Sequence, residues 1–127
     1  MADHAPATTV MRRALLGNLH DAGLAIGAAV GQGKSAFFSA PGLCAHVLEC
    51  LELMRDSARD MPAADKAALS HIDWPALEAL PTQQQGPPHE WRERLWQIAH
   101  TLVPATTAAS VQSMTPQRPK AVARPRP

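Results

Sequence analysis

The side chains of this sequence that could hold a metal ion or transfer a proton are scattered along the chain. None of the six histidines forms an HxxxH or HExxH pair, and Cys44-x-His46 alone does not make a metal site. Glu52 and Asp56 stand one helical turn apart, but such carboxylates more often form a solvated helix face. We therefore expect no metal, no cofactor and no recognisable nucleophile motif.

Residues 28–35, AAVGQGKS, fit a loose phosphate-loop pattern with Ala in the place of the usual first Gly. A functional phosphate loop joins a β-strand to a helix, so that backbone amides face the phosphates. Here the preceding residues have a helical pattern, and only five residues separate Ser35 from Pro41. We expect a glycine-rich connector rather than a nucleotide site.

Composition indicates one helical domain in a reducing compartment. The 127 residues contain no Tyr and are rich in Ala and Leu. Cys44 and Cys50 are six residues apart, which turns a helix by about 240°, so they cannot easily form a disulfide. No run approaches the roughly 20 apolar residues of a membrane span. The expected location is the cytoplasm, with no membrane association.

The charge is unevenly distributed. Residues 115–127 carry four basic side chains and no acid, and removing them from the formal net charge of +1 leaves −3 for the rest. A mildly acidic body argues against a nucleic-acid-binding face outside the tail.

Apolar residues recur every three or four positions, which predicts an all-α, up-and-down bundle. The expected long helices cover residues 10–31, 43–61 and 89–103, and the short ones residues 62–69 and 73–80. We expect a flexible N-terminus at residues 1–9, the bundle at residues 10–110, and a disordered Pro-rich basic tail at residues 111–127.

Three glycines, Gly23, Gly27 and Gly31, step by four along the first predicted helix. Each weakens a helix by roughly 1 kcal/mol relative to Ala, so some contact should offset the cost. Close approach of another helix would do so, either within the bundle or at a subunit interface. Alternatively, the helix ends near Gly31. Trp91, in the last predicted helix, is a further candidate for an interface.

The order of several short motifs resembles a known family. Phe37-Phe38 precedes the second helix, which is rich in Leu and acidic residues and ends at Met61-Pro62. His71-Ile72-Asp73-Trp74 follows, and then Leu95-Trp96 in a helix that runs towards Pro104. Over about residues 10–108, this order is similar to the HepT-like toxins of the HEPN superfamily. The resemblance implies an HEPN-like bundle of three long and one or two short helices, a homodimer, and a nucleotidyltransferase-like antitoxin as partner.

The sequence departs from the family at the chemistry. Active members carry an Arg-polar-x3-His segment after Ile-x-Trp, with a Tyr just beyond, and these residues act on RNA and receive the antitoxin's modification. The corresponding residues 81–88, PTQQQGPP, contain neither Arg nor His, and the chain has no Tyr. The resemblance therefore implies a degenerate, catalytically inactive member that acts as an interaction module in a toxin–antitoxin-like or defence complex.

Two alternatives remain open. The first is a metal-independent ribonuclease with displaced residues, in which His89 or His100 is the base and Arg92 or Arg94 binds the scissile phosphate, so that RNA is the substrate. The second is an unrelated helical adaptor that binds a partner through the Pro-rich tail, residues 111–127.

Overall fold

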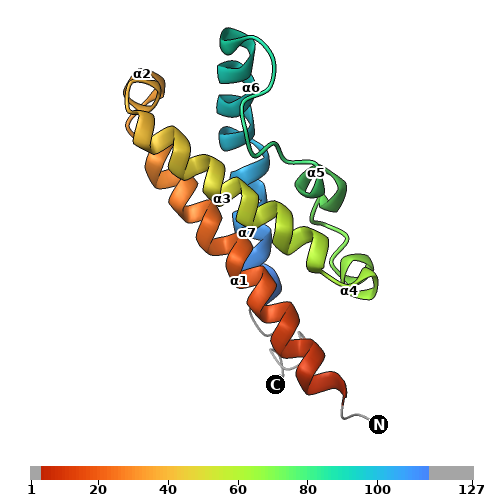
Figure 1. The fold of residues 1–127 in the computed structure, drawn as a ribbon. Coiled ribbons are helices and arrows are strands. Elements are labelled where there is room, and N and C mark those ends of the chain that lie inside the picture. The colour runs from red at the N-terminus through yellow and green to blue at the C-terminus, as the bar shows by residue number, and fades with distance from the viewer. Residues whose placement is uncertain (1–3, 115–127) are drawn as a thin grey trace, which may run out of the picture.

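The computed structural model describes residues 4–114, and side chains from Thr9 onward. Within that range the chain contains helices and no strand, which confirms the predicted all-α bundle (Figure 1). The helices are α1 (His4–Val30), α2 (Lys34–Phe38), α3 (Pro41–Asp60), α4 (Ala63–Ala68), α5 (Trp74–Glu78), α6 (Pro88–His100) and α7 (Leu102–Met114).

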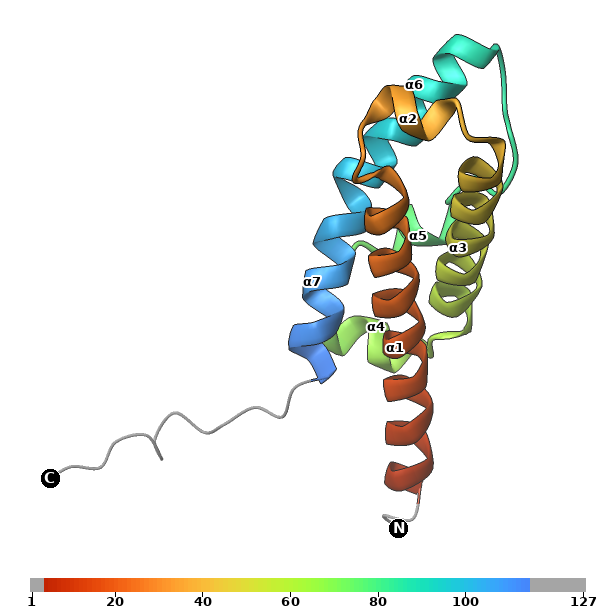
Figure 2. The same ribbon diagram turned by 90° about the vertical axis from the view of Figure 1, so that its left-hand side faces the viewer.

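Helix α1 is the centre of the bundle. It packs against α3 and against α7, and both run antiparallel to it (Figure 2). The chain goes up in α1, turns through α2 and comes down in α3. After α4 and α5, the connection at residues 79–87 returns to the top, so α6 and α7 run in the same direction as α3. This return brings the C-terminal half of the chain beside α1.

The apolar spacing of α1 and α3 explains their packing. Leu19, Ala22 and Ile26 are buried in α1, and the buried residues of α3 include Val47, Leu51, Met54 and Ala58. These residues recur at three- or four-residue steps and so face one side of each helix. Asn18 adds a polar contact between the two helices, because its side-chain amide donates to Ser57 Oγ at 3.1 Å.

The ends of the two long helices differ from the predicted ends. Helix α1 begins at His4, six residues before Val10, and Met11 is 45% exposed instead of belonging to the buried stripe. Helix α3 begins at Pro41, two residues before the predicted start at residue 43. Proline suits the first turn of a helix because no helical bond needs its missing N–H.

The connector between the long helices contains the short helix α2. Gly33 precedes it with a φ of 107°, a left-handed value that glycine adopts without strain. The Phe37 side chain is 1% exposed, and its ring packs edge-on to Phe38 at 4.7 Å between centroids. Trp96 of α6 lies 6.0 Å from each ring, so this aromatic cluster joins α2 to α6.

The last predicted helix is two helices in the structure. Thr101 separates α6 from α7 with φ −123° and ψ −72°, which are not helical angles. Pro104 lies in the first turn of α7 rather than ending a helix. Helix α7 continues to Met114, so residues 111–114 belong to the bundle, beyond the expected boundary at residue 110. The remainder of the predicted tail lies outside the described residues.

Candidate functional site

An apolar groove with a volume of about 560 Å³ lies between α1 and α7. Its lining consists mainly of small and apolar residues, which include Gly23, Leu24, Gly27, Ala28, Thr107 and Ala108. The lining contains no Lys, Arg, Asp or Glu; His20 is its one titratable side chain. We refer to this surface as the α1–α7 groove.

The structure separates the roles of the three glycines. A Cβ atom added to Gly23 would lie 1.9 Å from Thr107 Oγ1, so Gly23 permits the close approach of α7. Gly31 follows the last residue of α1, and its N–H donates to the carbonyl of Ala28 at 3.4 Å. Gly27 is exposed, and an added Cβ would meet nothing within 4 Å. Both of the alternatives that the glycine spacing left open therefore occur, at different positions.

Gly27 and Leu24 together give the groove its shape. Gly27 leaves a hollow in the last turn of α1, at a helix-propensity cost that no contact with the described part of the chain offsets. Leu24 stands one turn earlier with 55% of its surface exposed. An exposed leucine beside a glycine hollow presents a projection and a recess on one uncharged surface.

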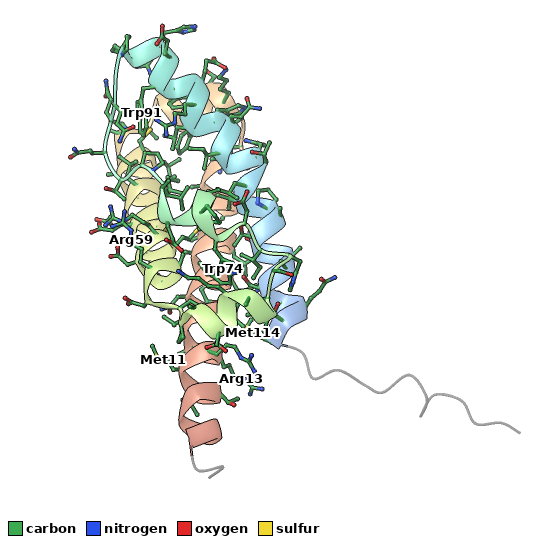
Figure 3. All side chains as sticks on the ribbon, turned by 90° about the vertical axis from the view of Figure 1, so that its right-hand side faces the viewer. Met11, Arg13, Arg59, Trp74, Trp91 and Met114 are labelled. Carbon is green, nitrogen blue, oxygen red and sulfur yellow. The ribbon has the colours of Figure 1, made fainter. Side chains whose placement is uncertain are left out.

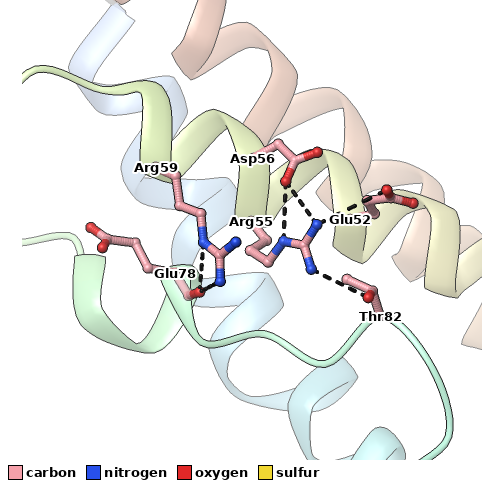
Figure 4. Close-up of polar contacts among 6 residues, drawn as sticks. All are labelled: Glu52, Arg55, Asp56, Arg59, Glu78 and Thr82. Atoms are coloured by element: carbon pink, nitrogen blue, oxygen red, sulfur yellow. Dashed lines mark hydrogen bonds and ion pairs between the residues drawn. The ribbon is translucent and has the colours of Figure 1, made fainter.

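The connection at residues 79–87 occupies the place where the nuclease motif was expected, and its polar contacts are with structural arginines. Arg55 donates to Thr82 Oγ1 at 3.3 Å, while its guanidinium also pairs with Asp56 at 2.9 Å (Figure 4). Arg59 donates twice to the Glu78 carbonyl oxygen, at 3.0 and 3.2 Å (Figure 4). Through these contacts, α3 holds both the end of α5 and the connection that follows it.

Of the candidate catalytic residues of the ribonuclease alternative, His89 and Arg92 line one pocket, and Arg94 and His100 do not line it. Arg94 donates to Gln85 Oε1 at 2.8 Å. His100 stacks on Trp96, with 4.2 Å between ring centroids, and its Nδ1 lies 2.9 Å from the Trp96 carbonyl oxygen. His89 lies at the other end of α6 and lines a separate pocket with Arg92.

That separate pocket lies between α2 and α6, has a volume of about 510 Å³, and is lined by six polar or charged residues and Phe38. We refer to it as the α2–α6 pocket. Lys34 and Glu93 form an ion pair across it. The Lys34 hydrogen bond and charge, together with the charge of His89, lower the pKa of Glu93. Arg92 lies over the Phe38 ring, 5.7 Å from its centroid.

Trp91 lies in the core of the chain. Its side chain is 6% exposed and points inward from α6 towards the bundle (Figure 3). Little of its surface is therefore left for contact with a partner, in contrast to Leu24.

The cysteines are free thiols in the structure. Burial raises the pKa of Cys44, with a smaller opposing effect from Arg92, and burial together with the charge of Glu49 raises the pKa of Cys50. No group of three or more His, Cys, Asp or Glu side chains within the described range is placed to hold a metal ion. No helix in that range is sufficiently long and apolar to cross a membrane.

Two features of these sites were not predicted from the sequence. Thr107 and Ala108 were placed beyond the last predicted helix, so α7 was not recognised as one wall of the groove. The run of small residues at 105–110, ATTAAS, could have indicated a helix that packs against the glycines of α1. Small side chains let two helices approach closely. Lys34 was seen only as part of a phosphate-loop pattern, and its proximity to α6 depends on the fold.

Comparison with known proteins leaves the chain without an assigned family. No family model matches the sequence, and neither the curated proteins nor the solved structures show a significant match.

Proposed function

We propose that this protein is a catalytically inactive interaction module of the HepT-like kind, which pairs with a second copy of itself through the α1–α7 groove. The observation that carries the proposal is the hollow at Gly27 beside the exposed Leu24. In the proposed cellular complex the further partner is a nucleotidyltransferase-type protein, as the order of the sequence motifs suggests.

Self-pairing fits the chemistry of this surface. In a two-fold symmetric dimer, each residue near the axis faces its own copy, so a charged surface repels itself. The α1–α7 groove contains no Lys, Arg, Asp or Glu, which removes that penalty. Its projection and its recess lie on the same surface, so that Leu24 of one subunit can enter the hollow beside Gly27 of the other.

An inactive role agrees with the contacts of the basic residues near the expected motif. Arg55 is paired with Asp56 and bonded to Thr82, and Arg94 is bonded to Gln85. Binding a phosphate at either arginine would compete with the contacts that hold the connecting segment in place. The absence of a motif histidine from residues 81–88 points in the same direction.

Sedimentation velocity over a range of protein concentrations tests the homodimer. We expect reversible dimerisation with a Kd of about 1–10 μM, as is common for small interfaces. Leu24→Asp should weaken dimerisation at least ~100-fold, because two carboxylates would be buried close together. Gly27→Leu should also weaken it, by filling the hollow.

Leu53→Asp is the matched control. Leu53 is also an exposed leucine, at 43%, but it lies on α3 and does not line the groove. Its substitution should leave the dimer intact, and thermal melts should show that each variant remains folded. A wild-type protein that stays monomeric at all accessible concentrations, or equal weakening by both Asp variants, would contradict the proposal.

The inactive role needs a separate assay. Purified wild-type protein should not cleave RNA, and a variant with His89→Ala and His100→Ala should behave identically. Cleavage by the wild type that the double substitution abolishes would establish the ribonuclease alternative instead.

A further inference from the structure

The pocket between α2 and α6 gathers basic side chains from two parts of the chain. Lys34 comes from the start of α2, and His89 and Arg92 come from the first two turns of α6. Ser35 supplies a hydroxyl group to the same lining, whereas the Ser39 hydroxyl donates to the Ser35 carbonyl oxygen at 2.9 Å. Lysine and arginine side chains that converge with hydroxyl donors are typical of sites that bind phosphate.

The formal charge of the lining is positive. Lys34 and Arg92 carry two positive charges and Glu93 carries one negative charge, so one positive charge is left before His89 is considered. Elsewhere in the described structure, Arg12, Arg55 and Lys66 each pair with a carboxylate, whereas Arg92 forms no ion pair with a described residue. The guanidinium of Arg92 instead lies over the Phe38 ring.

We propose that the α2–α6 pocket binds a phosphate monoester, with Lys34 and Arg92 as its cationic ligands and Glu93 as an internal competitor. In the free protein, the Glu93 carboxylate pairs with the Lys34 ammonium. A phosphate dianion carries twice the charge of the carboxylate and can contact Lys34 and Arg92 together. Phosphate binding therefore breaks the Lys34–Glu93 ion pair and forms two new ones, with Lys34 and with Arg92.

This site does not work as a phosphate loop. The residues before Lys34 form α1 rather than a β-strand, and α2 has only five residues. The contribution of the glycine-rich segment is instead positional, because the left-handed Gly33 turns the chain so that Lys34 faces α6. Recognition then depends on side chains, and the exposure of Lys34 and Glu93 predicts weak binding, with a Kd of about 1 mM.

Backbone amide NMR of the isotopically labelled full chain tests the site. Inorganic phosphate, added at constant ionic strength, should shift the signals of residues near Ser35, Phe38 and Arg92. Lys34→Gln and Arg92→Gln should each weaken the titration at least ~10-fold, and Glu93→Gln should strengthen it severalfold by removing the competitor.

Arg94→Gln is the matched control, because Arg94 lies on the same helix but bonds to Gln85 and does not line the pocket. It should leave the titration unchanged. Absence of saturable shifts, shifts that persist in both Lys34→Gln and Arg92→Gln, or equal shifts with chloride at the same ionic strength would overturn the proposal.

The source of the phosphate can be distinguished with the same signals. A nucleoside 5′-monophosphate that binds more tightly than inorganic phosphate, and that also shifts Trp96, would identify a nucleotide with its base against the aromatic cluster. Equal affinity would identify recognition of the phosphate group alone. Both results support the site, and neither depends on whether the α1–α7 groove forms a dimer.

Discussion

At the scale of single residues, identical amino acids have different roles according to what lies opposite them. Gly23 and Gly27 occupy equivalent positions one turn apart on α1. Gly23 faces Thr107, whose Oγ1 donates to the Val103 carbonyl at 2.8 Å and is held there. Gly27 faces the open groove. The fold therefore requires the first glycine, whereas no contact with the described residues requires the second.

Alanine substitutions at these two positions should have opposite effects on the free energy of unfolding. Gly23→Ala should destabilise the protein by about 1–3 kcal/mol, since the new methyl group collides with Thr107. Gly27→Ala should stabilise it by up to about 1 kcal/mol, because the helix gains propensity without a clash. Chemical denaturation of each variant at low protein concentration measures both.

Adding Thr107→Ala to Gly23→Ala should recover part of the loss, because it removes the nearest atom. Stabilisation by Gly23→Ala alone would mean that α7 does not approach α1 as closely as described.

At the scale of elements, the short helices depend on a few specific contacts because each buries little surface. Helix α5 is capped by Asp73, which accepts from the N–H of Ala76 at 3.1 Å, and its Trp74 donates from Nε1 to the Leu69 carbonyl at 3.1 Å. Helix α4 is joined to α1 by a hydrogen-bonded ion pair between Arg12 and Asp65, at 3.3 Å. The side chain of Asp65 is only 10% exposed.

Removing the Arg12 guanidinium should therefore lower the free energy of unfolding more than removing the guanidinium of the neighbouring Arg13. Arg12→Ala leaves the nearly buried Asp65 carboxylate without its cation, and we expect a loss of about 1–2 kcal/mol in the free energy of unfolding. Arg13→Ala, at an exposed position on α1 (Figure 3), should change it by less than about 0.5 kcal/mol.

Urea denaturation of the two variants beside wild type provides the comparison. Equal effects of Arg12→Ala and Arg13→Ala would show that the pair does not hold α4 against α1.

At the scale of the whole molecule, one apolar cluster extends from α1 to α7 and includes buried side chains of every long helix. A chain with a single core of this kind is expected to unfold cooperatively. Cys50 lies in that cluster at 9% exposure, and Cys44 packs at its edge. The two thiols can therefore report on opening of the bundle.

We expect alkylation of Cys50 in the native protein to be at least ~10-fold slower than in the denatured chain. Burial raises the pKa of both thiols, so the folded protein retains their protons at a pH where the unfolded chain releases them. The free energy of unfolding should consequently fall as the pH rises above the ordinary thiol pKa of about 8.5.

Mass spectrometry after timed alkylation, with a fully denatured sample as the control, measures the first effect. Denaturation curves at neutral and alkaline pH measure the second. Native and denatured rates that agree for Cys50 would contradict its burial.

The sequence alone predicted most of α1, α3 and α6 and the short helices α4 and α5, because their signals are local, but it predicted neither α2 nor most of α7. Apolar residues at three- and four-residue steps defined α1 and α3, and the missing Arg and His of residues 81–88 followed from reading the chain. The division at Thr101 was not predicted, because Pro104 can either end a helix or begin one. Only the surrounding packing selects between these two roles.

The tertiary structure decided which surfaces meet. It placed Thr107 against Gly23, left Gly27 in an open groove, and brought Lys34 beside Arg92 although α3, α4 and α5 lie between them in the chain. These contacts depend on the return of residues 79–87 to the top of the bundle, which sets α6 and α7 beside α1 and α2. Local spacing shows which side of a helix is apolar, but the partner of that side is determined by packing between distant segments.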